Sequence, residues 1–428
     1  MVVGLDIGTT KIMMVMGYLR DDGKVEICGY GKAPSSGVEY GLVFNVKGTT
    51  NSILAAMADL KTNVDQEISD VYVGVAGRHI KSRACTNSTT RTNGLENLVE
   101  DEEIARMTEE LEQYSIPGCD IISVIPQYYE VDGIRTMTPA GTLAQKVVGS
   151  YQIITGDTQE VRKIKLATNS ANLNLRSLML EPVASSIVCL TEEEKKQGVA
   201  LVDIGGGTTD VIIFESGVPL FIKVIPIGGQ IVTRDIQSLN LSYEQAEAIK
   251  IKHGTCFVDN ANKNDFVTIP EQSGYTESRK ISEFNLSQII NARVANDILG
   301  AVKKEIDASG YADKVRSVVL TGGGALMRDI QILSEYIIMR KTRIGMPVHG
   351  FVNVESALND PTCSTALGLL RAGCISEGTP FSGLVETEAP VTPSGKNTSK
   401  ESNAATKVFD VVKNWLKNFT FDESEGID

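Results

Sequence analysis

The chain has 428 residues, a formal net charge of −13 and a sequence pI of about 5.0. This length predicts two or more domains, and the acidity argues against nucleic acid as the principal partner, because duplex binding depends on lysine and arginine. The seven cysteines are odd in number and scattered, without a C-x-x-C pair. That pattern predicts reduced thiols rather than a disulfide framework or a zinc site.

The first predicted elements form a hairpin with a polar tip. Apolar residues 3–5 and 12–16 flank the turn Asp6-Ile7-Gly8-Thr9-Thr10-Lys11. Glycine lets a backbone approach a phosphate closely, and amide and hydroxyl groups in such a turn donate hydrogen bonds to its oxygens. We therefore expect a phosphate-binding tip here. The next predicted elements are a strand at 25–30, a helix at 49–60 and a strand at 71–75.

Residues 79–160 form a block without a counterpart elsewhere in the chain. Its predicted elements are a helix at 100–114, which Pro117-Gly118 ends, and strands at 120–125, 128–131 and 146–154. We interpret the block as a small inserted α/β subdomain. A helix at 160–172 then returns to the first half, and a helix at 182–190 crosses to the second.

The phosphate signature recurs as Leu201-Val202-Asp203-Ile204-Gly205-Gly206-Gly207-Thr208-Thr209-Asp210, again followed by an apolar run at 211–214 and a strand at 220–225. A repeated unit predicts two related half-domains that grip the phosphates of one nucleotide. Asp6 and Asp203 end their strands where a Mg²⁺ on those phosphates would need ligands, directly or through water. The alternative is that both are ordinary turn acids.

The second half continues with a helix at 242–253, a long helix from about 285 and a strand at 317–321. Glu247 and Lys250 share a helix face. They could contact a ribose or the edge of a base, or they could pair with each other, and their spacing favours a solvated ion pair. The turn Gly322-Gly323-Gly324 with Ala325 precedes a helix predicted from Leu326, and a base or ribose can lie against its bare backbone. Residues 236–305 are predicted to be an insertion.

The C-terminal part is predicted to be a solvated linker at 376–406, a helix at 407–421 and an acidic tail at 422–428. The helix is too short to span a bilayer, and its apolar stripe with a basic border suits an anionic membrane surface, although packing on the protein's own core is the alternative. The membrane-facing residues of this prediction are Val408, Val412, Lys413, Trp415, Leu416, Lys417 and Phe419.

In this order the motifs resemble the actin, hexokinase and heat-shock ATPase superfamily and, within it, the FtsA family of bacterial division proteins. The resemblance is carried by the first signature, Val75-Ala76-Gly77-Arg78-His79-Ile80, Val124-Ile125-Pro126 with Val131-Asp132-Gly133, and Gly228-Gly229-Gln230 with Ala246-Glu247-Ala248-Ile249-Lys250. Connectors with small residues follow at 181–185 and 364–368.

The resemblance implies an α/β, actin-like ATPase fold with two related half-domains around a nucleotide cleft and an inserted SHS2-type subdomain. The first half would comprise 1–78 and 161–198, the subdomain 79–160, and the second half 199–235 and 306–375. The subdomain would take part in longitudinal polymer contacts, and the insertion at 236–305 would dock the C-terminal tail of FtsZ. Arg279 and Arg293 are the expected partner contacts, although Asn291-Ala292-Arg293 replaces an acidic-Pro-Arg element of the family.

The resemblance also implies ATP and Mg²⁺ as cofactors. Asp6, Asp203 and Glu181 would organise the metal through water. Asp210 and Thr209 are the candidates for assisting hydrolysis, which is expected to be weak or absent. The remaining nucleotide contacts would be Gly8, Thr9, Thr10, Lys11, Gly205, Gly206, Gly207 and Thr208 for the phosphates, and Glu247, Lys250, Gly322, Gly323, Gly324, Ala325 and Leu326 for the adenosine.

The resulting prediction is a peripheral protein of the cytoplasmic membrane face at the division septum, which polymerises and tethers the FtsZ ring with other division proteins. A PilM-like pilus-assembly ATPase shares the subdomain but needs no terminal helix. A sugar kinase would need a catalytic aspartate in a substrate cleft, and a chaperone ATPase would need a C-terminal substrate domain; neither feature is recognisable in the sequence.

Overall fold

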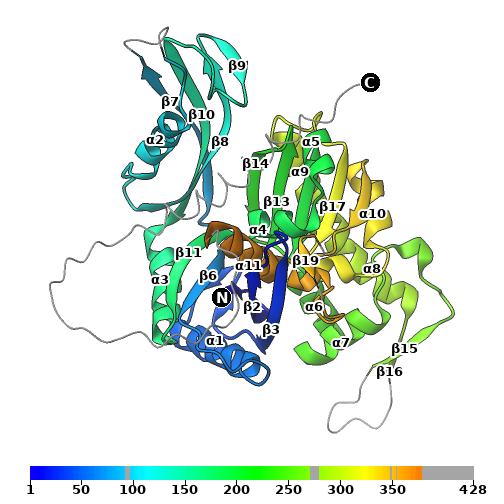
Figure 1. Ribbon diagram of the computed structural model, residues 1–428. Helices are drawn as coiled ribbons and strands as arrows, with labels where there is room; N and C mark the ends of the chain where they lie inside the picture. Colours follow the sequence, from blue (N-terminus) through cyan, green and yellow to red (C-terminus); the bar gives the residue numbers. More distant parts are fainter. Residues whose placement is uncertain (92–96, 270–278, 348, 353, 378–428) are drawn as a thin grey trace.

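The computed structural model describes residues 1–428 except 92–96, 270–278, 348, 353 and 378–428. Two halves, each built on a mixed β-sheet, lie on either side of two connecting helices, and a smaller subdomain stands on the first half (Figure 1). The first two residues of the predicted linker, 376 and 377, instead end a helix; the rest of the linker, the membrane helix and the acidic tail lie outside the described residues. Within the described part, no helix is both long enough and apolar enough to cross a membrane.

The first sheet has the strand order β11-β6-β1-β2-β3-β19. Strands β1, β2 and β3 pair antiparallel, whereas β6 and β11 continue from β1 in parallel. Helices α1 and α3 pack together on one side, and α11 lies against β1 and β2. The bounds are β1 Val2–Ile7, β2 Lys11–Leu19, β3 Val25–Pro34, β6 Asp70–Val75, β11 Asn174–Leu180, β19 Phe351–Val352, α1 Val46–Leu60 and α3 Thr158–Ser170.

The second sheet repeats this topology as β14-β13-β12-β17-β18. Strands β12, β13 and β14 pair antiparallel, and β17 and β18 continue from β12 in parallel. Because pairing order, direction and the position of the two signatures agree, the predicted duplication is confirmed in the fold. The bounds are β12 Val199–Ile204, β13 Thr209–Glu215, β14 Val218–Ile225, β17 Ser317–Thr321 and β18 Lys341–Ile344.

The subdomain is a four-stranded sheet, β7-β10-β8-β9, covered by helix α2. The prediction of separate strands at 120–125 and 128–131 is wrong, because β8 is continuous and accommodates Pro126 beside a β-bulge. Strand β7 was not predicted, since its residues are mostly exposed and polar. The bounds are β7 Lys81–Thr90, β8 Cys119–Val131, β9 Ile134–Thr136, β10 Lys146–Asp157 and α2 Asp101–Glu112.

The helices of the second half share a hydrophobic core with β12 and β17. The helix predicted from about 285 begins at Glu283, where the Ser282 side chain caps it. The helix predicted from Leu326 is misplaced: a single 3₁₀ turn, Gly323–Leu326, comes first, and Asp329 at φ +66° separates it from α10. The bounds are α5 Glu192–Gln197, α6 Gln230–Ile236, α7 Tyr243–His253, β15 Phe266–Ile269, β16 Arg279–Ser282, α8 Glu283–Arg293, a π-helical segment Val294–Leu299, α9 Gly300–Ala308 and α10 Ile330–Ile338.

Two helices connect the halves, α4 (Glu181–Cys189) and α11 (Ser364–Glu377). Both α11 and β19 come from the segment that the sequence analysis assigned to the second half. In the structure β19 pairs with β3, and the buried residues of α11 belong to the core of the first half. The chain therefore returns to the first half at its described C-terminal end.

Candidate nucleotide-binding cleft

The two glycine-containing tips have the same local geometry. Gly8 N donates to Lys11 O at 3.0 Å, and Gly205 N donates to Thr208 O at 2.9 Å. Each tip joins the first two strands of its sheet. The two signatures therefore form equivalent turns in the two halves.

The tips also face each other across the cleft. A Cβ atom on Gly206 would lie 2.3 Å from Cγ2 of Thr10, and one on Gly207 would lie 2.7 Å from Oγ1 of Thr9. A side chain at either glycine would collide with the threonine side chains of the first tip unless these moved. These glycines are thus needed for the juxtaposition of the halves, whatever ligand lies between them.

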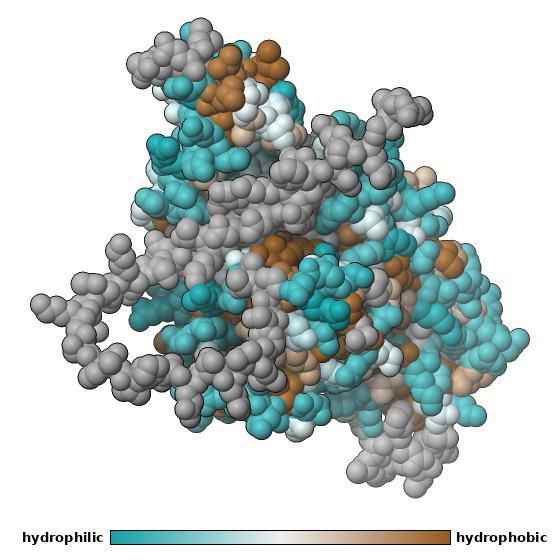
Figure 2. Space-filling view, in the orientation of Figure 1, coloured by the Kyte–Doolittle hydropathy of each residue, from teal (hydrophilic) through white to brown (hydrophobic). Residues whose placement is uncertain are grey.

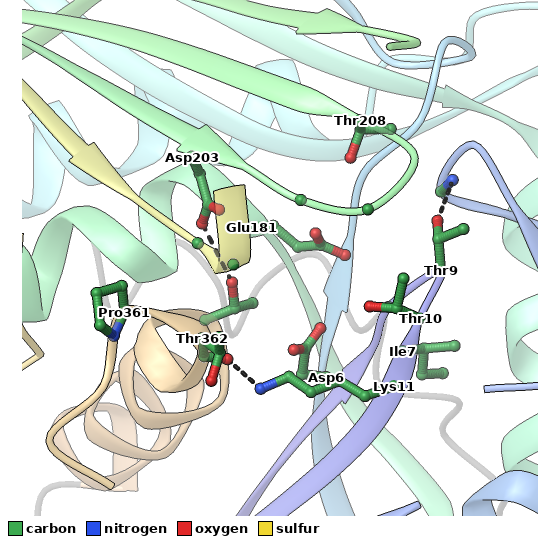
Figure 3. A pocket seen from close by; sticks show the side chains of 17 residues that line it. Asp6, Ile7, Thr9, Thr10, Lys11, Glu181, Asp203, Thr208, Pro361 and Thr362 are labelled. Carbon is green, nitrogen blue, oxygen red and sulfur yellow. Dashed lines mark hydrogen bonds between the residues drawn. The ribbon is translucent and has the colours of Figure 1, made fainter. Parts of the chain in front are cut away.

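A cavity opens between the tips and the ends of the central strands (Figure 3). Of the residues that the sequence analysis expected around a nucleotide, those in its lining are Asp6, Gly8, Thr9, Thr10, Lys11, Glu181, Asp203, Gly205, Gly206, Thr208, Gly322 and Gly323. Those outside the lining are Gly207, Glu247, Lys250, Gly324, Ala325 and Leu326. The metal residues and all the phosphate residues except Gly207 are therefore brought together, whereas of the adenosine residues only Gly322 and Gly323 line this cavity.

Asp6 and Asp203 end β1 and β12 and are buried at the bottom of the cavity. Burial raises the pKa of Asp6 from 3.8 to about 6, with Lys11 opposing the shift and Asp203 adding to it. Burial also raises the pKa of Asp203, whose Oδ2 accepts hydrogen bonds from Ser185 and Thr365. The site thus gathers carboxyl groups where water is scarce, so their charged forms are unfavourable unless a cation compensates them.

Glu181 and Asp210 extend this acidic group. The pKa of each is raised well above its ordinary value, first by burial and then by neighbouring carboxylates. Asp210 Oδ1 has no hydrogen-bond partner among the described residues. Glu181 points into the cavity from the start of α4, together with Asp6 and Asp203 (Figure 3).

The donor set suits a magnesium ion carried by phosphates. In the described part of the chain, no three acidic, histidine or cysteine side chains are close enough to hold a metal by themselves. Mg²⁺ commonly keeps several waters and takes only one or two protein carboxylates beside substrate phosphates. The buried carboxylates and the glycine tips fit an ion held in that way.

Lys11 and the glycine turn that begins at Gly322 also line the cavity. Lys11 Nζ donates to the carbonyl oxygen of Thr362. Gly322 has φ +79°, and a Cβ there would lie 2.3 Å from Oδ1 of Asp203. The glycine turn is therefore required for packing against the Asp203 carboxylate as well as for any approach of a ligand.

Glu247 and Lys250 form an ion pair at 2.7 Å, as their spacing favoured. Lys250 Nζ also donates to Thr233 Oγ1 at 2.9 Å and to Gly229 O at 3.3 Å. Because Gly229 N donates to Gly205 O, this network lies directly behind the second tip. The pair supports the phosphate loop whether or not it touches an adenosine.

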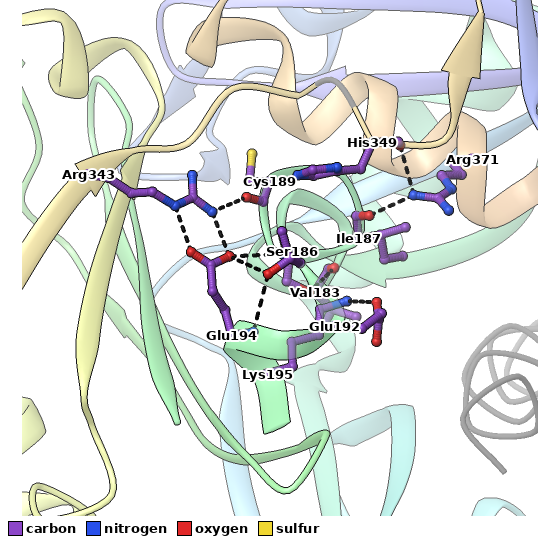
Figure 4. Close-up of polar contacts among 11 residues, drawn as sticks. Val183, Ser186, Ile187, Cys189, Glu192, Glu194, Lys195, Arg343, His349 and Arg371 are labelled. Atoms are coloured by element: carbon purple, nitrogen blue, oxygen red, sulfur yellow. Dashed lines mark hydrogen bonds and ion pairs between the residues drawn. The ribbon is translucent and has the colours of Figure 1, made fainter. Parts of the chain in front are cut away.

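The connecting helices cross at very close range. A Cβ on Gly368 would lie 2.0 Å from the carbonyl oxygen of Ala184. At the other end of α4, Arg371 Nη1 donates to Ile187 O at 2.9 Å and Arg343 Nη2 to Cys189 O at 2.8 Å, satisfying helix-terminal carbonyls (Figure 4). The predicted role of small residues in the connectors agrees with this geometry.

Several cavity residues were missed by the sequence analysis. Gly41, Pro361, Thr362 and Thr365 line the cavity. Thr365 lies in a segment that was identified only for its small residues, and the motif Glu39-Tyr40-Gly41 carries a turn signal but no sign of its distant partners. Thr209, one of the two hydrolysis candidates, instead donates its hydroxyl to Ile227 O at 2.7 Å.

The expected partner residues lie on the second half, away from the cavity lining. Arg279 is exposed on β16 and donates to Leu239 O at 2.8 Å. Arg293 pairs with Asp235 at 2.6 Å and with Asp297 at 2.8 Å. Arg279 is thus the better exposed of the two, and the membrane-facing residues of the 407–421 helix lie outside the described residues.

Comparison with known proteins connects these features to one family. A family model described as "Cell division protein FtsA" matches residues 200–368, and one described as "SHS2 domain inserted in FTSA" matches residues 77–155. The protein named cell division protein FtsA of Neisseria meningitidis serogroup B is 35% identical over 381 residues, covering 87% of this chain and 90% of the relative. That of Escherichia coli K12 is 30% identical, covering 94% and 97%.

Among solved structures, the chain is similar to one titled "PilM-PilN type IV pilus biogenesis complex". The TM-score is 0.61 at 15% sequence identity, and the match covers 87% of this chain and 98% of that one. At this identity the likeness concerns the fold alone. Together with the match to the inserted SHS2 domain, it confirms the predicted α/β fold class with its insertion.

Proposed function

The chain belongs to the FtsA family of actin-like cell division proteins, and on that premise we propose that it binds Mg²⁺-ATP, polymerises and tethers the FtsZ ring to the cytoplasmic membrane at the division septum. The observation that carries the nucleotide part is the pair of equivalent glycine tips facing one acidic cavity. The adaptor part rests on the terminal amphipathic segment of the sequence.

In this proposal the phosphates lie between the two tips. Backbone amides and hydroxyls of Thr9, Thr10 and Thr208 donate to them, and Lys11 leaves the carbonyl of Thr362 for a phosphate oxygen. The metal would be held near Asp6, Asp203 and Glu181, where it supplies charge neutralisation of phosphates and carboxylates. Without it, bringing a polyphosphate beside these acids would be electrostatically unfavourable.

Nucleotide is proposed to act mainly by closing the cleft and setting the competence to polymerise. The two halves meet at the tips and at the crossing of α4 and α11, so a ligand that joins the tips biases their relative orientation. Hydrolysis is proposed to be weak or absent. Phosphate release and nucleotide binding, measured for the Asp6→Ala and Asp210→Ala variants, test this. If both variants lose nucleotide binding equally, Asp210 has no specific role in hydrolysis.

Self-assembly is supported by the surface of the subdomain. Its end farthest from the two halves carries exposed apolar side chains, which Figure 2 shows as a brown group. These residues include Leu98, Ile134, Met137 and Leu143. An exposed apolar group of this kind suits a protein–protein contact, in keeping with a longitudinal contact between copies of the chain.

Membrane attachment is proposed to come from the helix at 407–421. Three lysines contribute about 1 kcal/mol each at an anionic surface, and the acidic tail offsets part of that. One helix should therefore bind weakly, whereas a polymer presents many helices to one surface and gains avidity without new contacts. Assembly and attachment would then be coupled.

Co-sedimentation with anionic vesicles, with and without ATP and a peptide of the FtsZ tail, tests the adaptor function. Leu416→Glu should abolish sedimentation, whereas Asn414→Glu adds the same charge on the polar face and should retain most of it. Peptide binding should fall in Arg279→Glu and persist in Lys341→Glu, a matched charge reversal at an exposed residue of β18. Unchanged vesicle binding after removal of 407–428 would refute the attachment.

A further inference from the structure

A short hairpin of the first half covers the place where the two glycine tips meet. Strands β4 (Val38–Glu39) and β5 (Leu42–Val43) pair antiparallel and are joined by Tyr40 and Gly41. Gly41 N donates to Thr9 Oγ1 at 3.2 Å. The hairpin is therefore hydrogen-bonded to the first tip.

The same turn touches the second tip. A Cβ on Gly207 would lie 3.0 Å from Cα of Tyr40, and one on Gly41 would lie 3.1 Å from Cγ2 of Thr208. Gly41 is also part of the cavity lining. The turn thus spans both phosphate tips at the edge of the cavity.

Tyr40 adopts a backbone conformation that is unfavourable for its residue type. Its φ is +51°, and Gly41 follows at +73°, as in a two-residue hairpin turn with both central residues left-handed. Asparagine, aspartate or glycine is the usual residue at such a position, and a bulky side chain there is uncommon. The presence of tyrosine calls for a role of its side chain.

That side chain reaches across to the second half. Tyr40 Oη accepts a hydrogen bond from Nη1 of Arg234 at 2.8 Å, and the guanidinium carbon lies 5.7 Å from the ring centroid. Arg234 belongs to α6, whose first residues bond to the second tip: Gly229 N donates to Gly205 O and Gln230 N to Gly206 O, both at 2.9 Å. The contact therefore joins the cover of one tip to the helix that supports the other.

From this arrangement we propose that Tyr40 and Arg234 form a clasp that closes the phosphate end of the cleft and sets how long nucleotide stays bound. The inference rests on the proposed binding of nucleotide between the tips. Nucleotide passing this edge of the cavity must separate the hairpin from α6, and so must break the clasp. Tyr40 and Arg234 act as positioning residues, because they hold the hairpin over the phosphates without lining the cavity themselves.

If the clasp controls nucleotide exchange, its loss should change the rates of nucleotide binding and release, whereas loss of a purely structural contact should not. Arg234 is exposed and Tyr40 keeps 39% of its surface exposed, so the loss of one charge-assisted hydrogen bond is worth only a few-fold in rate. Tyr40→Phe, which keeps the ring, should raise the dissociation rate constant of nucleotide about threefold, and Arg234→Gln about fivefold. Association should accelerate as well, so the equilibrium affinity changes less than either rate.

Stopped-flow fluorescence with a mant-ATP and Mg²⁺ probe on the full chain, chased with unlabelled ATP, measures these rates. The double variant should be no faster than Arg234→Gln, because both changes remove one contact. Tyr336→Phe on α10 is the matched control and should leave both rates unchanged. As a second readout, Tyr40→Asn relieves the left-handed tyrosine, so the nucleotide-free protein should melt no lower than wild type while exchange accelerates.

The outcomes separate the two hypotheses. If wild type binds mant-ATP and the variants exchange it at the wild-type rates, the clasp is refuted and the nucleotide site stands. If wild type binds no mant-ATP at all, the proposed function fails and the clasp with it. Faster exchange in Tyr40→Phe, Arg234→Gln and Tyr40→Asn without loss of thermal stability supports the clasp.

Discussion

Replacing Gly368 by alanine should destabilise the hinge between the halves. The added Cβ would lie 2.0 Å from the carbonyl oxygen of Ala184, so α4 and α11 must separate by roughly 1.4 Å to restore an ordinary contact of about 3.4 Å. Overpacking of this kind costs about 1–3 kcal/mol and occasionally more, and alanine returns about 1 kcal/mol through helix propensity. Because the clash is with backbone, we expect the upper end of this range, which leaves a net loss of about 2 kcal/mol.

Thermal unfolding followed by circular dichroism should show this as a melting temperature lower by about 2 °C, because the unfolding entropy of a chain of 428 residues is roughly 0.9 kcal/mol/K. Gly373→Ala is the matched control in the same helix. Its Cβ would meet side-chain atoms of Val2 and Tyr72 at 2.6–2.9 Å, which can move more easily than backbone, so its loss should be about 1 kcal/mol or less. Equal stability of the two variants would refute the view that close backbone crossing at Gly368 holds the hinge.

Three further results are expected. In metal-free buffer above pH 6, the free energy of unfolding of Asp6→Asn should exceed that of wild type by up to about 3 kcal/mol. Folding raises the Asp6 pKa from 3.8 to about 6, so wild type is stabilised by the proton on Asp6 and loses this stabilisation as the pH rises through that range. Urea unfolding should show the difference vanish near pH 4. Gly207→Ala should weaken binding of a fluorescent ATP analogue about tenfold, since its Cβ would meet Thr9 Oγ1 at 2.7 Å and push the tips apart; unchanged affinity would contradict the facing-tip geometry. Glu247→Gln should cost about 1 kcal/mol or less in urea unfolding, because its ion pair with Lys250 is partly solvated, and a much larger loss would show that the pair does more than support the loop.

The parts of the site that could be predicted from the sequence are those marked by a pattern of neighbouring residues. Both tips combine an apolar run, an aspartate and a glycine turn within about ten residues, and the structure gives them equivalent hydrogen bonds. Their repetition also predicted the related sheets, since a duplicated signature with matching flanks implies a duplicated fold. The order of strands around each tip follows from that one observation.

What was missed depends on contacts between distant segments. Strand β7 is an edge strand that pairs only with β10 and is mostly polar, so no apolar alternation marks it. The return of α11 to the first half depends on packing against β1 and β2, which no local pattern encodes. Likewise, Tyr40 finds its partner 194 positions along the chain, and the left-handed Asp329 that delays α10 has no signature in the sequence.

The placement of the subdomain bears on how cleft closure would reach a polymer contact. The subdomain is inserted between β6 and α3, both of the first half, yet at the bulge of β8 the buried side chain of Gln127 donates to Pro219 O of β14 at 2.8 Å. β14 belongs to the second sheet. Rotation of one half against the other must therefore either carry the subdomain with β14 or break this buried hydrogen bond, which is costly. A ligand that joins the two tips would thus bias the orientation of the same subdomain whose far end carries the exposed apolar side chains proposed for self-assembly.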